Sequence, residues 1–561
     1  MKNISSDTET PRNKAYNLHK SGNIRDAVSL YESILESEST NADVVGLLAL
    51  ALYQTGDSDN AFKHWTRCLA LGSDARTRLR NANNYLTAFL APTAASKTGD
   101  AINFDLPAWP QDEIPETAEK GMVLSLARGL NQVGRRQQVF DLLQSLLPWV
   151  SGDLDVLGKS LRVLWEAGYV KWVDKYLSMT FSPEQDTDGQ LLLLRAATAS
   201  AANRIEESEE YVSRAIDAIP FYLTARTESQ KFLIGVLNRA PMCVETPLTP
   251  QEFHFTENTP ASLASRFSDK YRFLSIFPEA ATVRPALAAQ PRPDFVINNW
   301  VNAEVLSTPG TLSFISAFAD SLEQTVLNHP VSAAMTTRQR NAENLRGIPN
   351  LIVPRILRFV NQPNDPTNIV RLIKNDVGLP VIVRDPFHQM GKQASKFDMA
   401  DQLFEHLRSI PALELYAIQY VHNPAAKGLY RKIRAAVIGE ELIISHVHFG
   451  EQWNVHRERD DTKIQSVNQK KTIVSFADAV LNDPSDALGK SALLALEAIK
   501  KKISLDLYGI DFDLMRDGQV LFFEANAAMS ISFYGPFGRQ KVRGRMRDAL
   551  DRLFIRKLNR N

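Results

Sequence analysis

A set of four residues recurs after 34 positions near the start of this 561-residue chain. Each set holds a glycine, an alanine, an aromatic residue and a leucine: Gly22, Ala27, Tyr31 and Leu35, then Gly56, Ala61, Trp65 and Leu69. Glycine permits the backbone of a tight turn between two helices, and alanine lets two helices approach closely. One helix pair cannot bury its own apolar face, so the repeat predicts a stack of helix pairs.

Later, less regular units extend the pattern: Gly134 with Gly168, Leu143 with Leu177, and a last group of Asn203, Ala215 and Pro220. The pattern resembles the tetratricopeptide repeat. That resemblance implies five units stacked in an all-α solenoid over residues 8–222. The proline-rich stretch 90–119 breaks the period, which predicts a loop or insertion there.

The solenoid leaves two roles open. Its concave surface can recruit a peptide, a protein or a carrier, and the same architecture also serves as a scaffold or a dimerisation element. Nothing in the sequence identifies a partner, so both interpretations stand.

The pattern changes after Pro241, where prolines interrupt about fifty residues without a sustained helical period. Runs of β-branched residues then alternate with helical stretches, which predicts an α/β fold. The runs are 294–297, 352–353 and 380–383. We therefore expect four further parts: a connecting segment over 223–290, an α/β domain over 291–380, a second over 381–550, and a basic C-terminal helix over 537–561.

The most specific local signal is Asp517-Gly518 between two apolar, alternating runs. This dipeptide favours a two-residue type I′ hairpin, because both central positions need a positive φ. Counting outward pairs Arg516 with Gln519, Leu514 with Leu521, Phe512 with Phe523, and Asp511 with Glu524. Asn526 then lies on the same face as Glu524, while Phe512, Leu514, Leu521 and Phe523 form the opposite, buried face.

Two carboxylates directly opposite each other destabilise a strand pair, so Asp511 and Glu524 favour a cation between them. Two carboxylates and the amide oxygen of Asn526 suit Mg²⁺, which keeps positions for water and phosphate oxygens. The alternative is a solvated hairpin that binds no metal.

Gly509-Ile510-Asp511 followed by Glu524-Ala525-Asn526 resembles the metal motif of the ATP-grasp superfamily. Upstream segments resemble other elements of that family: 378–384 the strand with a nucleotide-binding lysine, 415–421 the adenine hinge, and 430–439 a strand with phosphate-binding basic groups. The resemblance covers about 290–550, and the nearest branch is that of glutathione synthetase and the RimK-like ligases. It implies a C-terminal α/β (α+β) ATP-grasp fold.

The resemblance also implies residue roles. Asp511, Glu524 and Asn526 would bind Mg²⁺, Arg384 and Arg434 would act as catalytic phosphate-binding groups, Lys392 and Lys432 would add cations, and Gln419, Tyr420 and Val421 would frame the adenine. Arg384 departs from the family's lysine, Gln419 from its common glutamate, and the loop 385–392 has one glycine where several are usual. His388 or Lys392 could compensate for the missing glycines.

The implied activity is an ATP-dependent carboxylate–amine ligase, an enzyme that forms a C–N bond through an acyl-phosphate. ATP and Mg²⁺ would be its cofactors, as two ions for which Mn²⁺ can substitute, with a carboxylate and an amine as substrates. A peptide or protein bound by the repeats is a candidate acceptor. Two alternatives stay open: a phosphotransferase that stops at the phosphorylated product, and a nucleotide-binding sensor or scaffold.

Histidines gather between His388 and His456, and His446 and His448 would share one strand face. Together with Trp453 and His456 they are candidate substrate contacts. A zinc site or simple packing is the alternative for the histidine pair, and a structural surface loop is the alternative for Trp453 and His456.

Lys+Arg and Asp+Glu both number 64, so the chain lacks the basic excess of a non-specific nucleic-acid binder. The basic residues of 537–561 accompany apolar positions at helical spacing, which favours an amphipathic helix over an anion or nucleic-acid site. The two cysteines lack a CxxC spacing, and no apolar run has the length of a signal peptide or membrane span. We expect a cytoplasmic protein without membrane contact.

Overall fold

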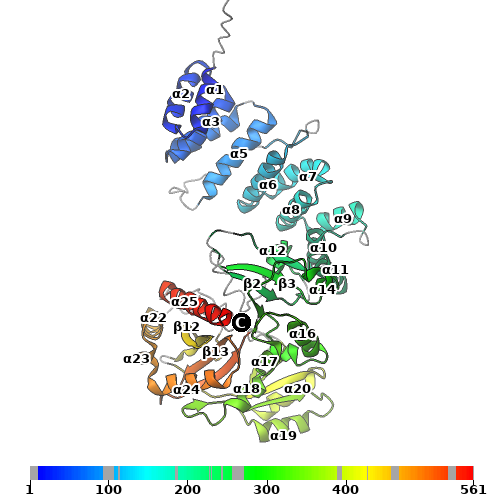
Figure 1. The fold of residues 1–561 in the computed structure, drawn as a ribbon, viewed down its shortest axis with the longest axis vertical. Helices are drawn as coiled ribbons and strands as arrows, with labels where there is room; N and C mark the ends of the chain where they lie inside the picture. Colours follow the sequence, from blue (N-terminus) through cyan, green and yellow to red (C-terminus); the bar gives the residue numbers. More distant parts are fainter. Residues whose placement is uncertain are drawn as a thin grey trace, which may run out of the picture. The chain divides into compact units, whose positions relative to one another are not determined.

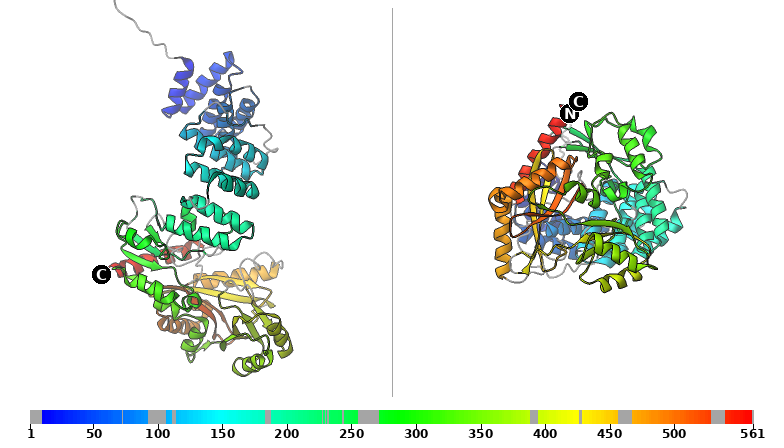
Figure 2. Two further views of the ribbon diagram at one scale, coloured as in Figure 1. Left: turned by 90° about the vertical axis from the view of Figure 1, so that its right-hand side faces the viewer. Right: turned by 90° about the horizontal axis from the view of Figure 1, so that it is seen from below.

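The structure is a computed structural model of the chain (Figures 1 and 2). It describes residues 10–71, 73–91, 106–110, 114–182, 187–226, 228, 230, 232–241, 244–254, 271–387, 394–425, 428–455, 467–527 and 539–559. These form two compact units, which we treat separately. The first comprises 1–218 with 241–249, and the second 219–240 with 250–561.

The first unit is helical, and its successive helices pack against one another (Figure 2). The helices are α1 (Pro11–Lys20), α2 (Ile24–Ser37), α3 (Ala42–Gln54), α4 (Ser58–Ala70), α5 (Ala75–Leu90), α6 (Thr117–Gln132), α7 (Arg136–Val150), α8 (Leu154–Glu166), α9 (Val170–Thr180), α10 (Gly189–Ala201) and α11 (Ile205–Ala218).

The repeated glycines lie where the sequence predicts them, in turns between helices. Gly22, Gly56, Gly134 and Gly168 have φ between +77° and +98°, and Asn203 takes the same place between α10 and α11 with φ +59°. Positive φ is the conformation that glycine adopts without steric cost. These turns support helix pairs, whereas membership of the tetratricopeptide family remains a resemblance.

The aromatic positions of the first two sets are core residues, because Tyr31 and Trp65 are fully buried. The predicted loop 90–119 also carries a core residue. Trp109 is 1% exposed, and its backbone N–H donates to Ser145 Oγ at 2.8 Å. Trp109 thus packs onto the helices, and the segment without helix extends to Thr117, where α6 begins.

The second unit opens with a five-stranded sheet in the order β1-β3-β2-β4-β5. The strands are β1 (Phe221–Leu223), β2 (Phe232–Leu237), β3 (Tyr271–Ile276), β4 (Phe295–Asn298) and β5 (Val326–Leu327). All pairs are parallel except β1 with β3. The expectation of a mere connecting segment over 223–290 is therefore wrong, since β2 and β3 are central strands. β2 is a short, continuous apolar run, which is typical of a strand covered on both faces.

A second sheet, in the order β7-β10-β8-β9, is antiparallel throughout. Its strands are β7 (Ile356–Val360), β8 (Val381–Arg384), β9 (Ser395–Phe397) and β10 (Glu414–Gln419). Helices α19 (Pro366–Asp376) and α20 (Ala400–Ser409) pack on it through a shared apolar core that includes Ile373, Leu403 and Leu407.

The third sheet has the order β12-β11-β13-β14-β6. Its strands are β6 (Leu351–Ile352), β11 (Tyr430–Ile438), β12 (Glu441–Gly450), β13 (Leu507–Leu514) and β14 (Val520–Asn526). The expected division at residue 380 does not follow these sheets, because β6 and β7 precede it yet pair with β14 and β10. Contacts so distant in sequence leave no local signal.

Further helices connect the strands of the second unit (Figure 1). They are α12 (Pro250–His254), α14 (Val283–Leu287), α15 (Ala303–Leu306), α16 (Thr311–Asp320), α17 (Pro330–Ala334), α18 (Arg338–Leu345), α22 (Val467–Asn482), α23 (Pro484–Leu488) and α24 (Lys490–Lys502). No described helix is both long enough and apolar enough to cross a membrane.

The C-terminal helix α25 (Arg539–Leu558) packs on the rest of the second unit through the apolar positions that the sequence predicts. These are Met546, Leu550, Leu553 and Phe554, each at most 3% exposed. Phe554 contacts Phe295 of β4, with ring centroids 4.7 Å apart. Arg552 forms a bidentate ion pair with Glu441, at 2.6 and 2.7 Å. Part of the basic face thus attaches α25 to the third sheet.

Candidate functional site

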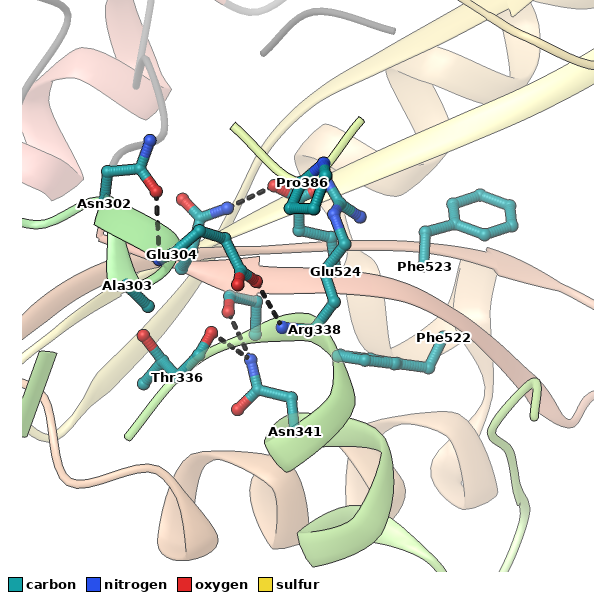
Figure 3. A pocket seen from close by; sticks show the side chains of 12 residues that line it. Asn302, Ala303, Glu304, Thr336, Arg338, Asn341, Pro386, Phe522, Phe523 and Glu524 are labelled. Atoms are coloured by element: carbon teal, nitrogen blue, oxygen red, sulfur yellow. Dashed lines mark hydrogen bonds and ion pairs between the residues drawn. The ribbon is translucent and has the colours of Figure 1, made fainter. Parts of the chain in front are cut away.

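A pocket of the second unit is formed by four segments that are separated in sequence (Figure 3). It holds about 400 Å³ of empty space, part of it open to solvent. Its lining is residues 302–304, residues 522–526, and Thr336, Arg338, Asn341 and Pro386. Glu524 and Asn526, two predicted metal ligands, are among these lining residues.

Asp511 and Glu524 are directly opposite each other in the β13–β14 ladder, as the sequence predicts. The turn that leads to this pairing is different. Met515 N–H donates to Gln519 O at 2.8 Å and Gly518 N–H donates to Met515 O at 3.0 Å, which closes a three-residue loop. Gly518 has φ +82°, whereas Asp517 is not in the positive-φ region. The predicted two-residue type I′ turn is therefore wrong.

The longer loop shifts the ladder by one residue, and a bulge shifts it back. Next to the loop, Leu514 pairs with Val520 and Phe512 with Phe522, so the predicted pairs of these two residues are wrong. The register changes between Asp511 and Phe512, which leaves Phe523 as the extra residue of β14. Its side chain is 37% exposed and not on the buried face where we expected it.

The Asp511 carboxylate is buried and already neutralised by cations. Arg434 of β11 donates to both of its oxygens, at 2.6 and 2.7 Å, and Lys432 Nζ lies 3.6 Å away. Burial alone would raise the pKa of Asp511, but Arg434 and Lys432 outweigh it and hold the pKa well below the usual range. Burial acts to lower the pKa of Arg434, and its attraction to Asp511 produces a net rise.

Glu524 is paired with a different arginine, which the sequence analysis missed. Arg338, the first residue of α18, donates to Glu524 Oε2, and Asn526 Nδ2 donates to Glu524 Oε1. The other end of the Asn526 amide has no such contact: Oδ1 is buried and accepts no hydrogen bond from the described residues. A lone arginine 186 residues from its partner carries no pattern that sequence analysis can detect.

Arg384, the predicted phosphate-binding residue of β8, is 9% exposed and near the same pocket residues. Burial, followed by the nearby charge of Arg338, lowers the pKa of Arg384 to about 10, and the charge of Glu524 opposes this. Two guanidinium groups therefore interact electrostatically with the carboxylates of Glu524, Asp385 and Glu304 at this end of the site. Lys392 lies outside the described residues.

The predicted adenine hinge, residues 415–421, covers most of β10 and the two residues after it. Gln419 N–H donates to Arg355 O at 2.8 Å, and its side-chain Oε1 accepts from Arg355 N–H at 3.2 Å. Tyr420 N–H donates to Pro380 O at 3.0 Å. These contacts fix the hinge, and among the described residues Val421 N–H has no backbone acceptor.

His446 and His448 of β12 lie near the cations of β11, since Arg434 pairs with His446 and Lys432 with His448 in the ladder. The two imidazole rings are 4.7 Å apart. Burial, with Arg434 and His448 nearby, puts the pKa of His446 well below 6.5, so this ring is neutral.

Trp453 is separate from these histidines and contacts Tyr420, with ring centroids 6.1 Å apart. It therefore neighbours the hinge. His456 lies outside the described residues, so the fourth candidate substrate contact has no structural description.

Glu304 of α15 is a second residue that the sequence analysis missed. It is 5% exposed, and its carboxylate accepts from Tyr416 Oη at 2.8 Å, from Arg358 at 3.1 Å and from the Arg338 N–H at 3.1 Å. These contacts join the start of α18 to β7 and β10 of the second sheet. The role of Glu304 is to position Arg338 and the pocket wall.

The pocket's donor set fits a hard divalent cation at one end. Glu524 supplies a carboxylate and Asn526 an orphaned, buried amide oxygen, while Asp511 faces Glu524 across the ladder. Oxygen donors of these types are the ones that Mg²⁺ prefers. Within the described ranges, no cluster of three or more His, Cys, Asp or Glu side chains is suited to a metal, so the zinc alternative for His446 and His448 gains no third ligand.

No family model and no curated protein matches the chain. Solved structures similar to it include N5-carboxyaminoimidazole synthase from Aspergillus clavatus, with 13% identity over 53% of this chain and 69% of that one, and a TM-score of 0.32. The ATP-grasp ligase PsnB complexed with minimal precursor has 18% identity over 57% and 99%, and a TM-score of 0.33. D-alanine–D-alanine ligase from Coxiella burnetii has 13% identity over 59% and 96%, and a TM-score of 0.34.

Proposed function

We propose that the second unit is an ATP-dependent carboxylate–amine ligase of the ATP-grasp superfamily. The observation that carries this proposal is the pocket residue Glu524, which lies opposite Asp511 and interacts electrostatically with basic side chains from three elements. These are Arg384 of β8, Arg434 of β11 and Arg338 of α18. Carboxylates for a metal and cations for phosphates are the parts that phosphoryl transfer needs, since the reaction depends mostly on positioning and charge stabilisation.

Asp511, Glu524 and Asn526 hold Mg²⁺ in this proposal, as two ions that Mn²⁺ can replace. Bound metal supplies charge neutralisation at the phosphate oxygens. Arg434 and Lys432 keep Asp511 ionised even though it is buried. Asn526 orients Glu524 through its Nδ2 and keeps Oδ1 for the ion.

Nucleotide contacts come from the second and third sheets in this proposal. Arg384 of β8 and Arg434 and Lys432 of β11 are the phosphate-binding residues, and Lys392 is a further candidate in the loop after β8. The adenine is framed by residues 419–421, with the Val421 N–H as the backbone donor. Arg384 presents a planar, two-pronged donor where a lysine would present a point charge.

The reaction has two steps. A substrate carboxylate oxygen attacks the γ-phosphorus of ATP, the bond to the β–γ bridging oxygen breaks, and ADP leaves. An amine nitrogen then attacks the acyl carbon, the C–O bond to phosphate breaks, and the nitrogen loses its proton as phosphate departs. The buried arginines stabilise charge on the transferred group, and a closed pocket protects the acyl-phosphate from water.

The helical unit would recruit a peptide, protein or carrier that provides one of the two substrates. This recruitment role is supported by the architecture of stacked helix pairs alone. A chain that begins at residue 219 should keep turnover on a small acceptor and lose it on the macromolecular one, provided circular dichroism shows that it is folded. Unchanged turnover on a macromolecular acceptor would remove the recruitment role.

One observation favours a nucleotide-binding sensor or scaffold as a second candidate. Asp511 and Glu524 are each bound by an arginine, so a metal would have to compete with a stable ion pair at this site. A phosphotransferase is the third possibility, because it shares the first reaction step. Product analysis separates these activities.

The direct test is ADP release by the full chain with ATP and Mg²⁺, alone and with size-fractionated lysate. We expect release that one fraction stimulates, that Glu524→Gln abolishes and that Glu343→Gln retains. Glu343 is a matched control, because it is an exposed glutamate of α18 outside the pocket. ATP binding without release in any fraction would favour the sensor.

A further inference from the structure

The Arg338–Glu524 ion pair occupies a position that a metal would need. Both side chains line the pocket, and they are 15% and 17% exposed. We propose that Arg338 is an exchangeable counter-ion, which holds Glu524 in the ligand-free protein and turns to phosphate oxygens when a metal–nucleotide complex binds. This inference rests on the proposed function of Glu524 as a metal ligand. It predicts that metal and nucleotide bind cooperatively.

The exchange requires only a side-chain rotation, because the backbone around Arg338 is fixed. Arg338 N–H donates to Glu304 Oε1 at 3.1 Å, and Thr337 caps α18 by accepting from Arg340 N–H at 3.3 Å. Asn341 Nδ2 then ties α18 to β14 through Ala525 O, at 2.6 Å (Figure 3). Helix and strand are thus held together whether or not Arg338 stays on Glu524.

The local charge explains why metal and nucleotide would enter together. Arg384 interacts electrostatically with Arg338 and with the carboxylates of Glu524, Asp385 and Glu304. A divalent cation alone would have to displace Arg338 and leave that guanidinium beside Arg384 without the Glu524 carboxylate that now neutralises it. A polyphosphate supplies the missing negative charge and accepts hydrogen bonds from the released arginine.

The pair on the facing strand is built differently. Arg434 and Asp511 are neighbours in the β11–β13 ladder, joined by two hydrogen bonds, and neither residue lines the pocket. Breaking a buried pair of this kind leaves an uncompensated charge, which is costly. The exchange is therefore confined to Glu524, while Arg434 stays on Asp511.

Mn²⁺ binding measured by electron paramagnetic resonance tests this inference without turnover. The full chain is titrated with Mn²⁺ alone and in the presence of a non-hydrolysable ATP analogue. We expect Arg338→Met to tighten Mn²⁺ binding without nucleotide by about tenfold, and to reduce the enhancement by nucleotide by about the same factor. Arg340→Met is the matched control, because Arg340 contacts Ala334 and Met335 away from Glu524, and it should behave like wild type.

The outcomes test the exchange of Arg338 and the metal site at Glu524 separately. Equal affinity of wild type and Arg338→Met for Mn²⁺ alone, with nucleotide-enhanced binding in both, would overturn the exchange and leave the metal site intact. Absence of Mn²⁺ binding in every variant, even with nucleotide, would overturn the metal site itself. Arg338→Lys keeps the charge and should bind Mn²⁺ alone as weakly as wild type does, which separates charge competition from altered packing.

Discussion

Asp511 and Glu524 are opposite each other on β13 and β14, and each carboxylate is held by a different arginine. Two facing carboxylates would repel each other in the absence of cations. Arg434 of β11 and Arg338 of α18 remove that repulsion, so the arrangement is stable before any metal is bound. The Asp511 side chain is the more buried carboxylate, with 8% exposure against 17% for Glu524.

Loss of Arg434 should destabilise the protein strongly. Arg434→Met leaves the Asp511 carboxylate, whose side chain is 8% exposed, without its bidentate partner. Breaking a buried pair on one side costs about 3–5 kcal/mol, which urea unfolding can measure. Arg408→Met is the control: its ion pair with Glu405 is 64% and 69% exposed and should contribute under about 1 kcal/mol. A small effect at Arg434 would contradict this account.

His254 should make the protein less stable in acid. Its Nε2 contacts Ile219 O at 3.0 Å and its Nδ1 contacts Ser275 Oγ at 2.9 Å, and burial lowers its pKa to about 3. Between its unfolded pKa of about 6.5 and about 3, the unfolded chain binds a proton that the folded chain does not. Stability therefore falls with decreasing pH, by up to about 1.4 kcal/mol per pH unit.

The measurement is the free energy of unfolding as a function of pH, for wild type and His254→Gln. In the variant, this slope should fall by the contribution of about one bound proton. Parallel curves for wild type and His254→Gln would show that His254 is not a buried neutral imidazole.

Gly518 should be needed for the hairpin that aligns Asp511 with Glu524. Its φ of +82° is costly for a residue with a Cβ, so Gly518→Ala should destabilise by about 1–2 kcal/mol. Gly518→Asn should cost less, because asparagine tolerates this region better. Nothing lies within 4 Å of a Cβ at this position, so steric contact would not explain the loss. Equal stability of all three proteins in urea would contradict the loop geometry.

Arg384 should be required for nucleotide affinity through its charge. Arg384→Met should weaken binding of a fluorescent ATP analogue by tenfold or more, because a phosphate contact with a charged donor contributes about 1.5–3 kcal/mol. Arg384→Lys should retain more of the affinity than Arg384→Met, since the charge remains although the planar fork is lost. Similar affinities for Arg384→Met and wild type would remove Arg384 from the phosphate site.

The local features of the hairpin were predictable from sequence, and its long-range contacts were not. Alternating apolar residues around Asp517-Gly518 predict the ladder and the Asp511–Glu524 pair. Asp-Gly is compatible with a two-residue and with a three-residue loop, so the turn type could not be read. The correct pair was reached because the longer loop and the bulge at Phe523 offset each other.

Arg338 and Glu304 illustrate what sequence reasoning cannot reach. Each acts through partners more than a hundred residues away, in Glu524 and Tyr416, and neither belongs to a recognisable motif. The strand β2 was hidden for another reason. Its apolar run lies among prolines and is only six residues long, and such a run does not by itself distinguish a strand from a linker.

The central claim is that a carboxylate is activated as an acyl-phosphate, and hydroxylamine trapping tests it most directly. The protein is incubated with ATP, Mg²⁺, hydroxylamine and the lysate fraction that stimulates ADP release, and the products are analysed by mass spectrometry. The account predicts an ATP-dependent hydroxamate of one component, formed by wild type and Glu343→Gln and absent with Glu524→Gln. ADP release that yields only a stable phosphorylated product, with no hydroxamate, would contradict the ligase and indicate a phosphotransferase.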